Sequence, residues 1–493
     1  MTRVDQLKIK EWYNFSKLTM RLLKIPFVFI ALLLSNALYS QVTLQEEIDS
    51  LIDKTLPLAN VGVFVKDLQT GEIVYQRNAT KLLNPASNMK LLSAAAALYK
   101  LGPDYRYVTQ LAKENNDVYL IFNGAPSLTA EKLQSLILEL PKLGFDKIAG
   151  NFIIDASFFK PPFYAPGTSY DDLGWYYAAP SSAIIINENA IAYDFNAKEI
   201  NKVAEVTSKA VDNPLTIINE LTTVNRAQEK EHCSLNIEIL KDNTLRLYGC
   251  IAKTEQPKRM MLAIPNPNLF AEGIIKQTLT KNGIELKGKI VSGSTPSSAQ
   301  TIAKVESDVL TKLLAHMLEE SDNLYADSIT KLLAATLTGE GTYKQGAYSI
   351  KTILTQHTHL DMKQIELADG VGTRYNLITP EQLVILLSDL YHDEKIGPIF
   401  LTILPKMGRS GTLKDRMKKT LLAGKIAAKT GSMHDVSALS GYLATPNGKK
   451  YIFAIISNGV NTNILKAKEL EENILLTIAK ETDTKNNSPK NDD

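Results

Sequence analysis

Ser87 and Lys90 are the first residues in the chain whose types and spacing could perform chemistry. Side chains three positions apart on a helix share one face, so the lysine amine can reach the serine hydroxyl. A serine attacks a carbonyl group only when a base takes its proton, and a buried, uncharged lysine can act as that base. The same Ser-x-x-Lys spacing recurs at Ser157 and Ser328, so this pair alone does not predict an active site.

Two further motifs follow, Ser321-Asp-Asn323 and then Lys429-Thr-Gly431. The first supplies a hydroxyl and a carboxamide, although Ser234-Leu-Asn236 fits the same pattern. The second ends a predicted strand, where a cation and a hydroxyl could bind a carboxylate and the glycine would let a ligand backbone approach. The order Ser-x-x-Lys, Ser-x-Asn, Lys-Thr-Gly is typical of serine enzymes that react with penicillin.

The residues around these motifs resemble the D-alanyl-D-alanine carboxypeptidase/endopeptidase family, the class C low-molecular-mass penicillin-binding proteins. Ser321 lies 234 positions after Ser87, and Lys429 lies 108 positions after Ser321. The long first interval is typical of this family, in which two extra domains are inserted there. The resemblance covers the chain to about residue 480 and rests on these segments: 85–92, 175–180, 187–189, 320–327, 369–377, 428–432 and 436–442.

The resemblance implies a role for the serines and lysine of the first two motifs. Ser87 would attack the carbonyl of a terminal D-Ala-D-Ala peptide and form an acyl-enzyme, and its backbone N–H would line the oxyanion hole. Lys90 would take the proton of the attacking hydroxyl. Ser321 would relay a proton to the leaving amine, and Asn323 would hold the substrate backbone.

The third motif and two residues outside the motifs would bind substrate by the same resemblance. Lys429 and Thr430 would bind the terminal carboxylate, and the backbone N–H of Ser432 would complete the oxyanion hole. Asp172 matches the acidic position that would meet the free amine of a diaminopimelate-type stem peptide. Arg374 matches the position that would meet its carboxylate. The blander interpretations of these two are a turn-capping aspartate and a surface arginine.

Two other functions share this arrangement of motifs. A β-lactamase would use the same residues but must deacylate quickly, and no deacylation-glutamate motif is recognisable in a short loop. A non-catalytic wall-binding protein could use the same fold, but every catalytic position here holds a competent residue. The expected partners are peptidoglycan stem peptides and, as covalent inhibitors, β-lactam antibiotics. We expect no cofactor and no metal, because the histidines offer only His357-Thr-His359 without a carboxylate or cysteine at ligand spacing.

Apolar periodicity predicts that both ends of the chain build one sheet around an inserted middle. We expect an α/β (α+β) fold: a β-lactamase/transpeptidase-like domain with a central antiparallel sheet flanked by helices, interrupted by a large, mostly β insertion. The expected domains are a peptidase domain of residues 41–105 plus 305–480, an insertion of two nested accessory domains at 106–304, and a disordered tail at 481–493. The elements expected in the peptidase domain are helices at 44–53, 87–102, 308–317, 323–337 and 464–479 and strands at 61–66, 72–75, 425–429, 438–443 and 451–456.

The first forty residues are typical of a secretory signal. Six basic residues oppose two acidic ones, an apolar run follows at 25–34, and small residues precede Gln41. The run is shorter than the roughly 20 residues of a membrane-spanning helix, although an uncleaved anchor is the alternative. We therefore expect export across the cytoplasmic membrane to the periplasm, with at most peripheral membrane contact. The whole chain holds 55 basic and 53 acidic side chains, which argues against a nucleic-acid partner.

Cys233 and Cys250 are the two cysteines of the chain. They flank a predicted β-hairpin of residues 234–240 and 244–249 and lie at its open end. An oxidising compartment would allow a disulfide between them, and two unpaired buried thiols are the alternative.

Overall fold

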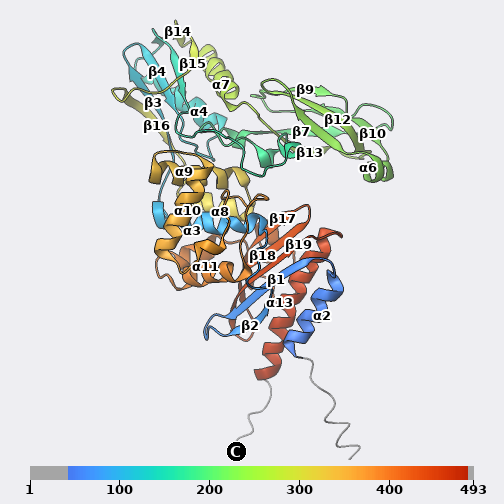
Figure 1. The fold of residues 1–493 in the computed structure, drawn as a ribbon. Coiled ribbons are helices and arrows are strands. Elements are labelled where there is room, and N and C mark those ends of the chain that lie inside the picture. The colour runs from blue at the N-terminus through green and yellow to red at the C-terminus, as the bar shows by residue number, and fades with distance from the viewer. Residues whose placement is uncertain (1–42, 487–493) are drawn as a thin grey trace, which may run out of the picture. The chain divides into compact units, whose positions relative to one another are not determined.

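The structure is a computed structural model that describes residues 43–486 (Figure 1). The chain divides into two compact units, residues 1–51 and 52–493, and every contact given below lies within the second. The predicted secretory signal lies outside the described residues. Within the described range, no helix combines the length and apolar character that crossing a membrane requires.

The main sheet joins strands from both ends of the chain. Its order is β17-β18-β19-β1-β2, and every neighbouring pair is antiparallel. The central contact pairs Gly62 with Ile456, so the predicted closure of one sheet by the two ends is confirmed. The strands are β1 (Asn60–Asp67), β2 (Ile73–Arg77), β17 (Ile426–Met433), β18 (Val436–Ala444) and β19 (Lys450–Asn458).

Helices cover both faces of this sheet. Ser437 and Tyr442 are five positions apart on β18 and therefore point to opposite faces. Ser437 donates to Glu471 of α13 (Ile464–Asn486) at 2.6 Å, whereas Tyr442 donates to the Leu387 carbonyl of α11 (Pro380–His392) at 2.7 Å. Because both faces are covered, β18 is buried along nearly its whole length, which explains its apolar sequence.

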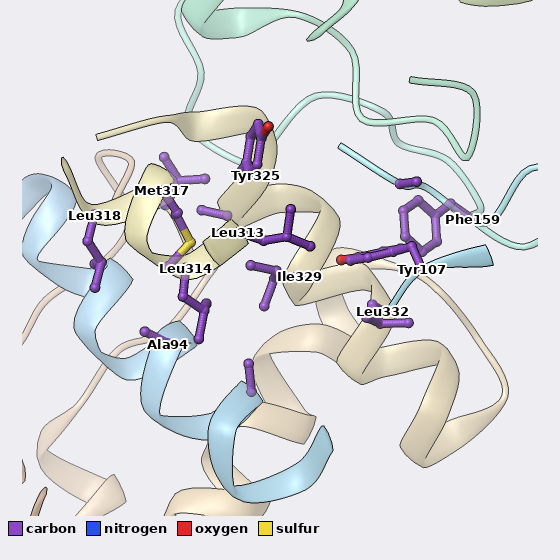
Figure 2. Close-up of a cluster of buried hydrophobic side chains, with 14 of the residues drawn as sticks. Ala94, Tyr107, Phe159, Leu313, Leu314, Met317, Leu318, Tyr325, Ile329 and Leu332 are labelled. Carbon is purple, nitrogen blue, oxygen red and sulfur yellow. The ribbon is translucent and has the colours of Figure 1, made fainter. Parts of the chain in front are cut away.

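The helical layer beside the sheet has one continuous hydrophobic core (Figure 2). Leu314 and Leu318 of α8 point toward α3, where Ala94 belongs to a run of four buried alanines. Small side chains let the helices approach closely, and Ile329 of α9 fills the space between them. The helices are α3 (Lys90–Leu101), α8 (Leu310–Glu319), α9 (Asn323–Thr338), α10 (Tyr343–His357) and α12 (Gly397–Ile403), and α2 (Leu44–Thr55) precedes them in the chain.

Residues 108–306 contain the remaining sheets, as the predicted mostly β insertion requires. Their orders are β15-β6-β4-β3-β16, β10-β12-β11 with β9 beside β12, β13-β7-β8, and β14-β5. These strands are β3 (Val108–Glu114), β4 (Asp117–Ile121), β5 (Lys147–Ile148), β6 (Phe152–Asp155), β7 (Ala190–Asn196), β8 (Glu205–Thr207), β9 (Thr216–Asn219), β10 (Thr222–Val224), β11 (Leu235–Ile239), β12 (Thr244–Ala252), β13 (Lys258–Ala263), β14 (Glu285–Leu286), β15 (Ile290–Ser292) and β16 (Gln300–Glu306). The segment also holds α4 (Ala130–Ile137), α5 (Glu139–Lys142), α6 (Arg226–His232) and α7 (Pro267–Lys281).

The predicted hairpin and its disulfide are both present. Strands β11 and β12 pair antiparallel, with Leu235 opposite Gly249. Cys233 and Cys250 are bonded at the open end of this hairpin, with their Cα atoms 5.7 Å apart. The disulfide prediction is therefore confirmed.

Three element boundaries differ from the prediction. The helix expected from residue 87 begins as a 3₁₀ turn, η1 (Ala86–Met89), and becomes α-helical only at Lys90. Strand β17 continues to Met433, so Lys429 lies in the middle of a strand and the prediction that its motif ends the strand is wrong. Helix α13 extends to Asn486, into the segment expected to be a disordered tail, and residues 487–493 lie outside the described range.

Candidate active site

The turn that carries Ser87 is held in an uncommon backbone conformation. Ala86 has a φ of 45°, in the left-handed region that side chains disfavour. The Asn84 side chain fixes this turn: its oxygen accepts from the Ala86 N–H at 2.8 Å, and its amide donates to the carbonyls of Thr373 and Asn376 at 2.9 and 3.0 Å. Ser87 is thereby presented, half-buried, at the start of a helix.

Two glycines allow the neighbouring backbones to pack against this turn. A Cβ atom at Gly372 would lie 1.8 Å from the Ala86 carbonyl oxygen, and the φ of Gly372 is 102°. A Cβ atom at Gly431 of β17 would lie 2.4 Å from the Pro85 carbonyl oxygen. Only glycine fits at either position, and the edge of β17 consequently lies directly against the residues that precede Ser87.

Lys90 is completely buried and holds the centre of the site together. Its Nζ donates to the Ser87 Oγ at 2.9 Å, to the Asn323 Oδ1 at 2.8 Å and to the Val371 carbonyl at 3.3 Å. Burial lowers the pKa of Lys90 to about 8, although nearby carboxylates, Asp322 first among them, oppose this shift. An amine with this pKa is neutral in a minority of molecules near physiological pH, a far larger fraction than for an ordinary lysine, and this neutral form can accept a proton from Ser87.

A second serine and lysine face the first pair. Ser321 has a φ of 60°, and its Oγ accepts from the Nζ of Lys429 at 2.8 Å. Lys429 is also fully buried, and burial, reinforced by the positive charge of Lys90, moves the pKa of Lys429 well below its usual value. Its Nζ also donates to the Thr430 carbonyl at 2.8 Å, and the Thr430 hydroxyl pairs with that of Thr412 at 2.8 Å.

Asn323 connects the catalytic lysine to the opposite wall of the site. It is the first residue of α9, and while its Oδ1 accepts from Lys90, its Nδ2 donates to the Tyr177 carbonyl at 2.8 Å. Both ends of the carboxamide are therefore bonded within the protein, and a positioning contact to Lys90 adds to the substrate contact that the sequence predicts. The sequence assigned no role to Tyr177, although it lies in the matched segment 175–180, and none to Thr412, which lies outside every matched segment.

The predicted residues surround one cavity of about 480 Å³. Asp172 and Arg374 both line it, Arg374 is exposed, and the Asp172 carboxylate accepts from the Tyr177 hydroxyl at 3.0 Å. The buried side chains of Lys90 and Lys429 and the half-buried side chain of Thr430 are not part of its wall. The predicted residues that do line the cavity are Ser87, Asp172, Ser321, Asn323, Arg374 and Ser432.

The cavity includes the free edge of the main sheet. Strand β17 is the edge strand, and residues 405–407 pair with its first half through a bridge between Lys406 and Ala427. From Lys429 to Met433 no strand pairs with the outer side of β17 among the described residues. An extended peptide can add to such an edge by backbone hydrogen bonds, with its carbonyl beside Ser432 and Ser87.

Two of the repeated spacings, Ser328 with Lys331 and Ser234 with Asn236, are structural. Ser328 donates to the Gly124 carbonyl at 2.5 Å, and Lys331 donates to three backbone carbonyls rather than to that serine. Asn236 lies on β11 and bonds the Ser234 carbonyl beside the disulfide. Spacing alone could not separate these pairs from Ser87 and Lys90, because only the tertiary structure determines which lysine meets its serine.

Comparison with known proteins gives one family and several relatives. The model of the D-Ala-D-Ala carboxypeptidase 3 (S13) family matches residues 44–479. A D-alanyl-D-alanine carboxypeptidase of Actinomadura sp. is 30% identical over 467 residues, which cover 89% of this chain and 86% of that protein. The D-alanyl-D-alanine carboxypeptidase DacB of Haemophilus influenzae is 29% identical over 423 residues, covering 83% of this chain and 88% of the relative.

Solved structures extend the likeness to three dimensions. The crystal structure of penicillin binding protein 4 (dacB) from Haemophilus influenzae matches with a TM-score of 0.81 and 27% identity, covering 88% of this chain and 99% of that one. The structure of the same protein complexed with a novel β-lactam matches with a TM-score of 0.76 and 26% identity, again over 88% of this chain and 99% of the other.

Proposed function

The chain belongs to the D-Ala-D-Ala carboxypeptidase 3 (S13) family and is a serine DD-peptidase, and we propose that Ser87 is its nucleophile. The observation that carries this assignment is the 2.9 Å contact between the Lys90 Nζ and the Ser87 Oγ at the wall of the cavity. The lowered pKa of Lys90 supports the role of the neutral amine as the base. A nucleophile, its base and an open cavity are together what acyl transfer requires.

Acylation begins when the Ser87 Oγ attacks the carbonyl carbon of the penultimate D-alanine and its proton passes to Lys90. The oxyanion that forms accepts hydrogen bonds from the backbone N–H groups of Ser87 and Ser432. The close packing of Gly431 against Pro85 supports this arrangement, because it brings β17 next to the nucleophile turn. Preorganised donors of this kind stabilise the transition state by about 2.7–4 kcal/mol each in a well-studied protease.

Collapse of the tetrahedral intermediate breaks the peptide bond and releases D-alanine as an amine. Ser321 relays to this amine the proton that Lys90 took from Ser87, so Lys90 becomes neutral again, while the buried Lys429 holds the Ser321 Oγ through its 2.8 Å contact. Water then hydrolyses the Ser87 ester, with Lys90 acting again as the base, and regenerates the enzyme.

The substrate that this cavity fits is a peptidoglycan stem peptide. Its backbone would add to the free edge of β17, and Thr430 together with the positive charge of Lys429 would attract its terminal carboxylate. Asp172 would meet the free amine of a diaminopimelate-type side chain and Arg374 its carboxylate, since both line the cavity with opposite charges. The cross-link between D-alanine and diaminopimelate has the same chemistry, so endopeptidase cleavage is within reach of the same residues. β-Lactams would acylate Ser87 as covalent inhibitors.

The peptidase domain comprises residues 41–105 and 305–480 in this proposal, and two nested accessory domains occupy 106–304. The disulfide between Cys233 and Cys250 supports an oxidising location, which for a wall enzyme is the periplasm. Residues 1–40 would be the signal that is removed on export. Sequencing the N-terminus of the exported protein tests this: a chain that begins near Gln41 is expected, and a retained apolar run at 25–34 would identify an anchor instead.

One experiment tests the proposed activity. The purified mature chain is incubated with a fluorescent penicillin and, separately, with a stem pentapeptide, and Ser87→Ala serves as the paired variant. Stable labelling together with release of D-alanine is expected, and both should be lost in the variant. Rapid turnover of the penicillin without D-alanine release would indicate a β-lactamase, and neither reaction would indicate a wall-binding protein.

A further inference from the structure

Glu188, His316 and Asp322 form a cluster of metal-ligating side chains beside the proposed active site. Their ligand atoms all lie within 4.8 Å of one another. The His316 Nε2 is 3.6 Å from the Glu188 Oε1 and 3.7 Å from the Asp322 Oδ2. Glu188 lies 128 positions before His316, and Asp322 follows His316 by six, so only the fold brings Glu188 to the other two.

The His316 Nε2 faces both carboxylates at ion-pair distance and forms a hydrogen bond with neither. The atom is shielded from solvent and has no hydrogen bond among the described residues. Both carboxylate oxygens are too far away for a hydrogen bond, whose N···O distance is about 2.7–3.2 Å. Three ligands at about 2.1 Å from one ion, with angles of about 109–120°, lie about 3.4–3.6 Å apart, which is close to the two distances measured here.

The local charge also favours a dication. A neutral imidazole, the form that binds metal, leaves the two carboxylates with a net charge of about −2, and the charge of nearby Glu320 adds to the negative potential. His316 also lies in the last turn of α8, at the negative end of the helix dipole. One imidazole nitrogen with two carboxylates suits Zn²⁺ and its first-row neighbours better than Mg²⁺ or Ca²⁺, which prefer oxygen ligands alone.

The backbone already holds each ligand in place. The Asp322 Oδ1 caps α9 by accepting from the Tyr325 N–H at 2.9 Å, so its Oδ2 remains to face His316. Glu188 lies in the 3₁₀ turn η4 (Asn187–Asn189), which is fixed because the Asn189 amide donates to the carbonyls of Pro180 and Ile184.

The helix that carries His316 is fixed as well. The His316 ring lies against that of Tyr325, with 4.4 Å between their centroids. Met317 of α8 and Tyr325 of α9 both belong to the hydrophobic core drawn in Figure 2. The ligands therefore need little rearrangement to close on an ion.

We propose that Glu188, His316 and Asp322 bind one divalent first-row transition metal ion, with Zn²⁺ the best fit and water in the remaining position. Asp322 lies between Ser321 and Asn323 in the chain, so the ion ties both of these residues to α8 and to the turn η4. It is a structural site that braces one wall of the cavity, and its existence does not depend on the acylation chemistry proposed for Ser87.

Metal binding to the purified, chelator-stripped mature chain tests the proposal. Titration with ZnCl₂ followed by calorimetry should give one equivalent per chain, with a rise in melting temperature that saturates with the ion. Co²⁺ in place of Zn²⁺ should give a visible absorption band of a site with nitrogen and oxygen ligands. Penicillin labelling is measured in parallel, so a failure of the proposed catalysis is recognised separately from a failure of metal binding.

Two ligand variants and one matched control assign the site. His316→Gln and Glu188→Gln should each weaken Zn²⁺ binding by more than tenfold, and the second variant decides if the first does not fold. His359→Gln is the control, because His359 contacts a single carboxylate, that of Asp389, at 2.8 Å; its binding should be unchanged. Absence of saturable binding below millimolar Zn²⁺, or binding that both ligand variants retain, would overturn the proposal.

Discussion

The pH dependence of acylation is the sharpest test of the role given to Lys90. Burial lowers the pKa of Lys90 to about 8, and the amine must be neutral to accept the proton of Ser87. Because the protonated form is inactive, kcat/KM should fall as the pH decreases through 8. Below that pH the decrease should approach tenfold for each pH unit.

The magnitude follows from the protonation equilibrium alone. An amine with a pKa of about 8 is about half neutral at pH 8 and about 1% neutral at pH 6, so the rate should decrease about fiftyfold between these values. Replacing the amine by Lys90→Met should reduce the rate by about 10²–10⁴-fold, the usual contribution of a general base. The pH–rate profile of the remaining slow reaction should lose its acidic limb near pH 8, that is, the range in which the rate falls as the pH decreases.

The assay is the second-order rate of acylation by a penicillin whose own groups do not titrate between pH 6 and 9. Lys331→Met is the matched control, since Lys331 is equally buried and follows Ser328 at the same spacing but contacts backbone carbonyls instead of that serine. This variant should keep the limb near pH 8 even if its melting temperature decreases.

A limb below pH 6 in the native enzyme would refute the reasoning, because the amine would then be neutral throughout the range and could not limit the rate. A limb that disappears in Lys331→Met and persists in Lys90→Met would show that Lys331, and not Lys90, is the base.

Three further predictions test single features of the structure. Arg374→Ala should reduce kcat/KM for a diaminopimelate-type peptide by about one to two decades, because a charge-assisted contact to the side-chain carboxylate of about 1.5–3 kcal/mol is lost. Penicillins without this carboxylate should acylate the enzyme at the native rate. An equal loss for the peptide and the penicillin would place Arg374 in the catalytic centre. Gly372→Ala should slow penicillin acylation by at least about a hundredfold, since the new Cβ would lie 1.8 Å from the Ala86 carbonyl oxygen. A native acylation rate would show that the turn carrying Ser87 can move to accommodate it. Cys233→Ser removes a disulfide between residues 17 positions apart and should lower the free energy of unfolding by about 3 kcal/mol. The melting temperature should decrease while the acylation rate stays unchanged. An unchanged melting temperature would show that the disulfide does not stabilise the fold.

The elements of the fold were predictable wherever their residues have a clear period. The apolar runs of β18 and β19 and the turn between them identify two central strands, because both faces of this sheet are covered. The helices of residues 108–306 were not predicted, and α7 shows why. Its amphipathic pattern is weak, and its start is defined by Asn266, whose side chain caps the helix. The extension of β17 to Met433 was missed because Gly431 and Ser432 have low strand propensity, which pairing with β18 overrides.

The chemistry proposed for this protein could be predicted from its sequence alone. Three motifs in a fixed order predict a serine nucleophile, a lysine base and a carboxylate-binding strand, since each residue type carries its reactivity wherever it lies in the chain. Which copies of a motif react is a different question. Ser87 with Lys90 and Ser328 with Lys331 have identical spacing, yet only the first lysine bonds its serine and only the first serine lines the cavity.

The distances between residues on which the function depends are set by the folded chain. The lowered pKa of Lys90 requires burial by segments from distant parts of the chain, and the contacts of Asn323 with Lys90 and with the Tyr177 carbonyl join three such segments. The cluster of Glu188, His316 and Asp322 arises in the same way. Burial, pKa and metal geometry depend on distances of a few ångströms between residues far apart in sequence, and such distances exist only after the chain has folded.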